Sequence, residues 1–223
     1  MKKTFLFFTI AFLILEISSN AQVTDKDGNV YKTVKIGTQE WMAENLNVSH
    51  FRNGDPIPEV EDAGAWAQAG KDGKPAWCYY DSNPVNGRTY HKLYNWYAVN
   101  DPRGLAPYGW HVPGSEWSDL YNKYFSDNNY KMWGAKMKAT YGWLNKGNGT
   151  NESGFTALPG GTRYGDSGAF GKIGRFGGWW GSSEDNNNHG YCRALYGNYD
   201  GFGSDSSNVN YKGEGFSVRC VKD

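Results

Sequence analysis

The sequence has no excess of charge, few cysteines and almost no long apolar runs. Its 223 residues carry 23 basic and 23 acidic side chains, so we do not expect a nucleic-acid-binding surface that depends on bulk positive charge. Three cysteines are too few for a dense disulfide scaffold. Beyond the amino-terminal segment, no apolar stretch is long enough to span a bilayer. The remaining chain, near 200 residues, can bury enough surface to fold without metals or many disulfides.

Glycine and aromatic residues are abundant instead. The chain has 30 Gly, 16 Tyr, 11 Phe and 10 Trp. Disordered segments are poor in aromatic residues, and helical bundles are rich in Leu and Ala, so both classes are disfavoured. The composition predicts a loop-rich domain, mostly β or β with a few helices, whose core is built largely from aromatic rings.

The first 21 residues have the three parts of a secretory signal peptide. A short basic start precedes an apolar run over residues 5–15, and a polar end follows with small residues at Ser19 and Ala21. The apolar run is about half of the ~20 residues that a membrane-spanning helix needs. We expect cleavage after Ala21 and a single exported domain over residues 22–223. No cysteine follows the cleavage point closely, so a lipoprotein anchor is not expected, and a periplasmic, cell-surface or secreted location stays open.

Two segments near the amino terminus predict a β-hairpin. Residues 30–36 are rich in β-branched and aromatic side chains that alternate between two faces. Gly37 and Thr38 then separate them from a second extended segment over residues 39–42.

Three further segments predict helices. The first covers residues 61–69 and ends at Gly70, and the second covers residues 116–125 with Ser115 as its N-cap. In the second helix the core-facing residues recur at helical spacing: Trp117, Leu120, Tyr121 and Tyr124. The third helix is expected over residues 130–139, with apolar side chains packed and three lysines mainly outward: Lys131, Lys136 and Lys138.

From residue 142 onward the sequence favours turns and short strands. Strand-like pieces occur at residues 179–180, 192–196 and 216–221. One of the adjacent residues Trp179 and Trp180 must point inward on a strand, so these rings are interpreted as core rather than binding groups. The last piece alternates regularly and fits a strand that closes a sheet at the carboxyl end.

Several blocks of sequence occur in the order found in one family of exported proteins. They cover residues 27–37, 41–46, 93–99, 106–113, 154–161 and 215–221. Together they resemble the Fibrobacter succinogenes major paralogous domain family, over nearly the whole chain after residue 21. This family has no established enzymatic activity and looks like a distant relative of the C-type lectin-like fold. The resemblance implies an α+β domain with small antiparallel sheets, two main helices and a long loop-rich carboxyl-terminal half.

An oxidising compartment allows one disulfide among the three cysteines. The resemblance implies that Cys78 and Cys220 match cysteines usual in the family, whereas Cys192 lies where an aromatic residue is more common. A Cys78–Cys220 bridge is therefore expected, with Cys192–Cys220 as the alternative. Either bridge would stabilise the fold by roughly 3–5 kcal/mol.

The sequence does not point to a metal or a cofactor. Asp25, Asp27 and Asn29 resemble the start of a calcium loop, but Ile36 stands where such a loop needs a glutamate. A hairpin turn is the better interpretation. The cysteines and the four scattered histidines lack the close spacing of a zinc site: His50, His91, His111 and His189.

Two pairs of carboxylates raise the alternative of an enzyme that acts on extracellular polysaccharide. Glu184 with Asp185 and Asp200 with Asp205 are the candidate pairs. Glycosidases need two carboxyl groups with different pKa values, and the sequence around these pairs gives no environment that would separate them. We expect no enzymatic activity. A purely structural envelope component is the third class that stays open.

The segment over residues 179–214 has the composition of a recognition surface. Tyr, Asn, Ser and Gly are favoured in binding loops because tyrosine rings offer contact area and small polar groups adapt their hydrogen bonds. A glycan or a cell-surface protein is the expected partner, and a solvated loop without a partner is the alternative. The candidate ligand-binding residues are Tyr191, Arg193, Tyr196, Asn198, Tyr199, Asp200, Asp205, Asn208, Asn210 and Tyr211.

The same residue types raise one further hypothesis. Tyr, Asn, Ser, Asp and Gly arise when adenines in Asn-type codons are substituted, which is the mark of diversity-generating retroelements. Lectin-like domains serve as their targets, so the resemblance permits diversification of these loops. A template repeat and a reverse-transcriptase gene beside this gene would support the hypothesis.

Overall fold

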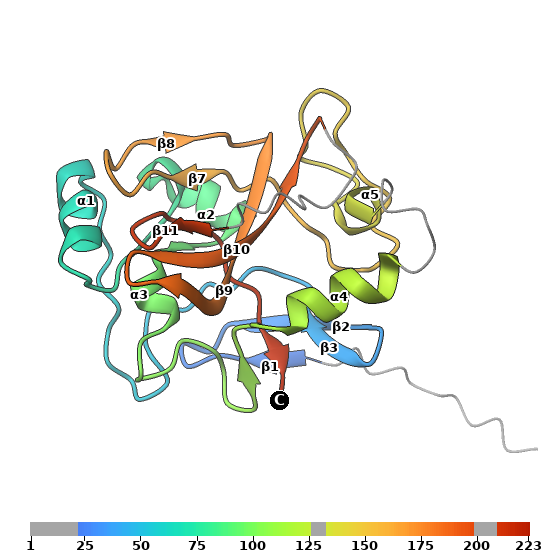
Figure 1. Ribbon diagram of the computed structural model, residues 1–223, viewed down its shortest axis with the longest axis horizontal. Coiled ribbons are helices and arrows are strands. Elements are labelled where there is room, and N and C mark those ends of the chain that lie inside the picture. The colour runs from blue at the N-terminus through green and yellow to red at the C-terminus, as the bar shows by residue number, and fades with distance from the viewer. Residues whose placement is uncertain (1–21, 126–132, 199–208) are drawn as a thin grey trace, which may run out of the picture.

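The amino-terminal hairpin forms part of a five-stranded antiparallel sheet, seen at the bottom of Figure 1. The computed structural model describes residues 22–125, 133–198 and 209–223, with the backbone alone over residues 121–125. The strand order is β1-β2-β3-β12-β6, and β2 pairs with β3 as the sequence predicts. The strands are β1 (Gln22–Thr24), β2 (Val30–Ile36), β3 (Gln39–Met42), β6 (Trp110–His111) and β12 (Val221–Lys222).

A long hairpin crosses the middle of the molecule and forms a second antiparallel sheet (Figure 1). It consists of β9 (Phe176–Asn186) and β10 (His189–Tyr196), with β11 (Val209–Tyr211) paired to the outer edge of β10. Two smaller antiparallel pairs complete the described sheets: β4 (Trp77–Cys78) with β5 (Leu93–Tyr94), and β7 (Thr162–Arg163) with β8 (Phe170–Gly171).

The helices lie around these sheets, with α1 at one edge and α4 and α5 at the other (Figure 1). They are α1 (Ala63–Lys71), α2 (Pro84–Tyr90), α3 (Trp96–Val99), α4 (Glu116–Phe125) and α5 (Trp133–Met137), with a short 3-10 turn at Tyr80–Ser82. The chain is therefore a mixed α+β protein with several antiparallel sheets, as expected. Within the described parts of the chain, no helix is long and apolar enough to cross a bilayer.

The first two expected helices agree in position with α1 and α4, although α1 continues through Gly70 to Lys71. The carbonyl of Ser115 accepts hydrogen bonds from the amides of Ser118 and Asp119, which places Ser115 at the start of α4. In α4, Trp117 and Leu120 are buried as expected, and the side chains of Tyr121 and Tyr124 lie outside the described residues.

The third expectation needs correction. The described part of the third helix is α5 alone, and residues 130–132 lie outside the described residues. Lys138 does not point outward: it is fully buried, with its amine 5.2 Å from the centre of the Trp143 ring.

Both Trp179 and Trp180 are core residues, because both faces of the β9–β10 hairpin are covered at its base. Their indole rings belong to two different core clusters on opposite sides of β9. The Trp179 indole donates a hydrogen bond to the side-chain oxygen of Asn45 (2.9 Å), and the Trp180 indole donates to the carbonyl of Tyr94 (2.9 Å).

The carboxyl-terminal segment is not one continuous strand, contrary to the prediction for residues 216–221. Every residue from 215 to 221 is buried, and successive residues pair with different elements. Phe216 exchanges backbone hydrogen bonds with Tyr94, whereas the carbonyl of Cys220 accepts from the amide of Met42 (3.0 Å). The regular strand β12 contains Val221 and Lys222, and it lies between β3 and β6 rather than at an edge. The segment therefore connects several elements and does not extend one ladder.

Arg219 holds this segment in place from inside the protein. Its guanidinium is almost fully buried and donates to the Asn45 side-chain oxygen (2.8 Å) and to the carbonyls of Met42, Phe155 and Thr156. It also lies 4.2 Å from the centre of the Phe155 ring. Burial lowers the pKa of Arg219 to about 9. Since a buried charge is costly without partners, these neutral acceptors are essential to the fold.

We expect Asn45→Leu to lower the free energy of unfolding by roughly 3 kcal/mol. The substitution removes the acceptor shared by Arg219 and Trp179 and leaves two buried donors without it. Denaturant titration measures the change. The same substitution at exposed Asn187, in the turn between β9 and β10, should change stability little. Equal effects at the two sites would contradict the role given to Asn45.

The expected disulfide is wrong, because all three cysteines are unpaired and buried. Cys78 packs with Trp66 and Leu93, whereas Cys220 lies in a different core cluster, which separates the first expected pair. Cys192 shares the cluster of Cys220, but these two thiols are also unpaired. Burial raises the pKa of Cys78 and Cys192 to about 12 and that of Cys220 higher still. The thiols therefore act as small apolar core groups.

Thiol labelling tests this correction. We expect a thiol-alkylating reagent to modify no cysteine in the native protein and all three after unfolding without reductant, measured by mass spectrometry. Val30→Cys, at an exposed position of β2, is the positive control for labelling of the native state. Modification of a single cysteine without reductant, rising to three with reductant, would contradict the unpaired state.

Candidate functional site

The structure describes six of the ten residues expected to bind a ligand. Tyr191, Arg193 and Tyr196 lie on β10, and Asn198 lies in the exposed turn after it. Asn210 and Tyr211 lie on β11. The other four lie outside the described residues: Tyr199, Asp200, Asp205 and Asn208.

The outer part of β10 presents tyrosine rings to solvent. Tyr191 and Tyr196 are 37% and 36% exposed, and each is oriented by a neighbour. The Tyr191 hydroxyl donates a hydrogen bond to Asp185 (3.1 Å), and this bond raises the pKa of the phenol. The Tyr196 ring meets the Phe176 ring edge-on, with 5.3 Å between the centroids. The two rings are thus held in fixed orientations.

Tyr191 and Arg193 meet at a shallow pocket of about 240 Å³ between the hairpin and the start of α4. The Arg193 guanidinium donates to the hydroxyl of Ser118 at 3.4 Å, which connects β10 to α4. Buried Trp117 and Cys192 form the apolar part of the pocket wall. The remaining lining residues are small or polar: Gly114, Ser115, Ser118, Gly181 and Ser183.

The serines of this pocket were not among the predicted site residues. Ser115 directly precedes α4, where a serine is adequately explained as an N-cap, and Ser118 lies in the first turn of the helix. Ser183 lies on β9, opposite the part of β10 that carries Tyr191. The hydroxyl groups of Ser115, Ser118 and Ser183 come together in one pocket because the β9–β10 hairpin packs against the start of α4.

Asn210 and Tyr211, the two predicted binding residues that lie on β11, do not line the pocket. The Asn210 amide donates to the sulfur of Cys192 at 2.9 Å, so this side chain supports β10 from the neighbouring strand. The Tyr211 ring lies against Gly213 and near Gly70 of α1. Of the predicted binding residues, Tyr191 and Arg193 therefore line one pocket. The others on the sheet lie apart from it: Tyr196, Asn210 and Tyr211.

The carboxylates considered for polysaccharide hydrolysis are engaged in local contacts. Glu184 accepts from the amine of Lys212 at 2.5 Å, and Asp185 accepts from Tyr191 and from the Asn186 amide. Adjacent residues on a strand point to opposite faces, so these two carboxylates do not face a shared cavity. Asp200 and Asp205 lie outside the described residues.

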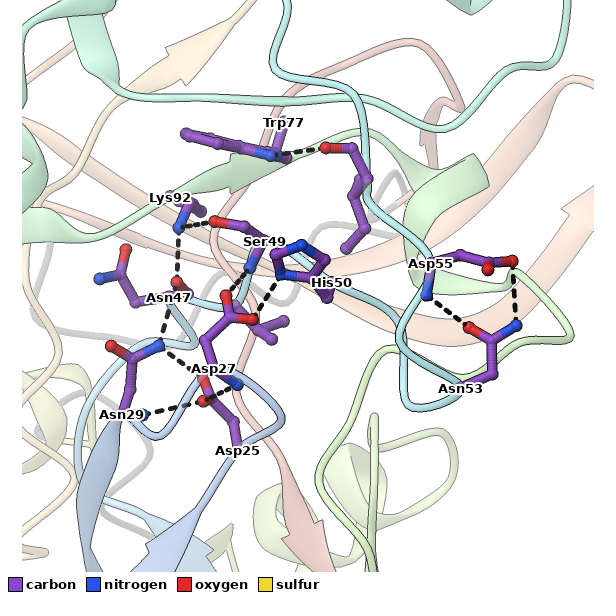
Figure 2. Close-up of polar contacts among 12 residues, drawn as sticks. Asp25, Asp27, Asn29, Asn47, Ser49, His50, Asn53, Asp55, Trp77 and Lys92 are labelled. Atoms are coloured by element: carbon purple, nitrogen blue, oxygen red, sulfur yellow. Dashed lines mark hydrogen bonds and ion pairs between the residues drawn. The ribbon is translucent and has the colours of Figure 1, made fainter.

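The aspartates that resemble a calcium loop form a closed turn (Figure 2). The Asp25 carboxylate accepts from the backbone amides of Asp27 and Asn29 and from the side chains of Asn29 and Tyr31. Asp27 accepts from the amide of Ser49 and from the His50 ring. In the described ranges, no group of three His, Cys, Asp or Glu residues is placed to hold a metal ion. The turn fastens the amino-terminal hairpin to the segment around residue 49.

A buried lysine completes this network. The Lys92 amine donates to the carbonyl of Asn47 (2.5 Å) and to the hydroxyl of Ser49 (2.9 Å), and it lies 4.2 Å from the centre of the Trp77 ring (Figure 2). Burial lowers the pKa of Lys92 to about 8. The folded state therefore binds the Lys92 proton less tightly than the unfolded state does.

The stability contributed by Lys92 should rise with pH. Between pH 8 and about 10.4, its usual value, the unfolded chain retains a proton that the folded protein has lost. Unfolding free energy of the wild type, relative to Lys92→Met, should increase by about 1–2 kcal/mol from pH 7 to 9.5. Denaturant titrations at both pH values measure this difference. The same difference taken against Lys71→Met, at an exposed position of α1, should show no such rise. A difference between the wild type and Lys92→Met that does not change with pH would contradict the account.

The protein is a mixed α+β domain. Its β9–β10 hairpin presents Tyr191, Arg193 and Ser183 at a pocket beside the start of α4. Residues 34–222 match the family model of the Fibrobacter succinogenes major domain. The chain therefore belongs to this family, as its sequence blocks indicate. No match was found among curated proteins or among solved structures.

Proposed function

We propose that the protein is an exported recognition domain that binds a glycan or a cell-surface protein through the β9–β10 hairpin and performs no catalysis. The observation that carries this proposal is the meeting of exposed Tyr191 with Arg193 at a pocket lined by serine hydroxyls. A tyrosine ring offers a large contact area at low entropic cost, and the polar groups around it fix the orientation of a ligand.

The position of the hairpin supports this role. Its base carries Trp179 and Trp180 into the two core clusters, whereas its outer part from Ser183 to Asn186 is exposed. A binding group on a rigid element loses little conformational freedom when a ligand binds. The hairpin thus combines a fixed base with an accessible surface.

Export is the second part of the proposal. Residues 1–21 have the layout of a secretory signal peptide, which favours a periplasmic, cell-surface or secreted location. The proposal also includes a distant relation to the C-type lectin-like fold. Small antiparallel sheets, peripheral helices and a carboxyl-terminal half built on β9, β10 and β11 support that relation.

Binding to a glycan array and to intact cells tests the proposal. Tyr191→Ala and Arg193→Gln should each weaken binding about tenfold or more, because both remove side chains that line the pocket. Tyr108→Ala removes a more exposed tyrosine outside this pocket, and it should leave binding unchanged. Unfolding temperatures of all variants establish that they are folded.

Two results would contradict the proposal. The first is binding that all three variants retain at the wild-type level. The second is release of soluble product from a polysaccharide that is abolished by Glu184→Gln or Asp185→Asn, which would make the protein an enzyme.

A further inference from the structure

A second cavity, of about 340 Å³, lies away from the hairpin pocket and shares none of its lining residues. It opens between the β2–β3 hairpin, the end of α2 and the loop that contains Thr156. Three cations line it, Lys32, Arg88 and Arg219, against one carboxylate, Glu44. With its histidine neutral, the cavity therefore carries a net positive charge.

The cation in the cavity wall that is most buried is Arg219. A guanidinium has five N–H donors, and four hydrogen bonds join this one to an amide oxygen and three backbone carbonyls. All four acceptors are neutral, and within the described residues Arg219 forms no ion pair and its fifth N–H has no acceptor. A charge held in a site of low dielectric constant attracts an anion more strongly than the same charge in water.

His91 lies beside Arg219 in a strained backbone conformation. Its φ of 62° and ψ of −156° fall in a region that is essentially restricted to glycine. The ring nitrogen Nδ1 donates to the carbonyl of Asn45 at 2.5 Å, which leaves Nε2 as an acceptor in the neutral ring. Burial lowers the pKa of His91, and the charge of Arg219 lowers it further. Such strain persists where the surrounding structure fixes a residue, and it is common at binding sites.

The mouth of the cavity has the features needed to hold a sugar ring. Tyr90 and Tyr141 line it, and Tyr141 is 55% exposed. Thr89 and Thr156 add hydroxyl groups. Glu44 accepts a hydrogen bond from the amide of Lys32 through one carboxylate oxygen, Oε2. The other oxygen, Oε1, is a suitable acceptor for a hydroxyl group of a ligand.

We propose that this cavity binds an acidic sugar of the uronic acid type. The carboxylate of the sugar pairs with Arg88 and Arg219, since guanidinium groups match the geometry of carboxylates. Its hydroxyl groups donate to Glu44, and its apolar face rests against Tyr141. A simple anion would contact the cations but neither Glu44 nor Tyr141. A neutral sugar would bring no negative charge to pair with Arg219. The combination of cations, one carboxylate and aromatic rings therefore favours a ligand that carries both an acid and hydroxyl groups.

Calorimetric titration of the native protein with trigalacturonate tests the site, with the neutral galactose trimer as the matched ligand. The acidic trimer should bind at least tenfold more tightly, and its affinity should fall with rising salt. Arg88→Gln should weaken binding at least fivefold, and Tyr141→Ala severalfold, without loss of fold. Lys35→Gln lies outside this cavity and is the matched charge control, which should bind as the wild type does.

Two further measurements distinguish this cavity from the hairpin pocket and from nonspecific attraction between charges. Tyr191→Ala should leave binding of the acidic trimer unchanged, so failure of the hairpin proposal does not affect this result. Nuclear magnetic resonance of the His91 ring should show a higher pKa in the presence of trigalacturonate, because a bound carboxylate stabilises the protonated imidazole.

Several results would overturn the proposal. These are equal affinity for the acidic and neutral trimers, no binding of the acidic trimer at millimolar concentration, and an unchanged affinity in Arg88→Gln. Sodium acetate or sulfate that binds as tightly as trigalacturonate would show a site for small anions and not for an acidic sugar.

Discussion

The fold depends on the burial of its carboxyl-terminal segment around Arg219. A guanidinium inside a protein needs an acceptor for nearly every N–H group, and these acceptors come from separate stretches of the chain. Met42 is the last residue of the amino-terminal hairpin and Asn45 follows it, whereas Phe155 and Thr156 lie more than 100 residues later in the sequence. Arg219 therefore fixes the relative positions of segments that share no strand ladder.

This arrangement also sets the position of the β9–β10 hairpin. The carbonyl of Ser217 accepts from the amide of Trp180, and the Ser217 amide donates to the carbonyl of Gly178. The base of the hairpin is thus bonded to the buried carboxyl-terminal segment, while its outer half extends into solvent. The same segment contributes Arg219 to the wall of the second cavity. One buried element therefore supports both surfaces to which we assign binding.

Local patterns in the sequence were sufficient to locate the β2–β3 hairpin and α4. β-branched and aromatic residues on either side of Gly37 marked the hairpin, and helical spacing marked the buried face of α4, where Trp117 and Leu120 are buried. Alternation did not record one buried face of β2, because Tyr31 and Ile36 point to opposite faces and both are buried. The segment over residues 216–221 alternates as well, but both of its faces are buried and its partners change from residue to residue. No local pattern records such a change of partner.

The errors at single residues have related causes. Lysine is usually exposed because it is charged, yet the Lys138 amine lies inside the protein, beside the Trp143 ring. The expected pairing of Cys78 with Cys220 came from a family resemblance, and the structure places the two thiols in separate clusters. Of the predicted site, Tyr191 and Arg193 meet at a pocket, but two of the serines opposite them come from the start of α4. Contacts between distant segments decide each of these outcomes.

Native-state hydrogen exchange tests the central role of the carboxyl-terminal segment most directly. The amides of Met42, Leu46 and Trp180 bond to Cys220, Val218 and Ser217, so they should exchange only through global unfolding. Their exchange free energies should equal the unfolding free energy from denaturant titration, and the amide of Asn188 at the hairpin tip should exchange far faster. Exchange of the first three amides through local opening, well below the global unfolding free energy, would contradict the account.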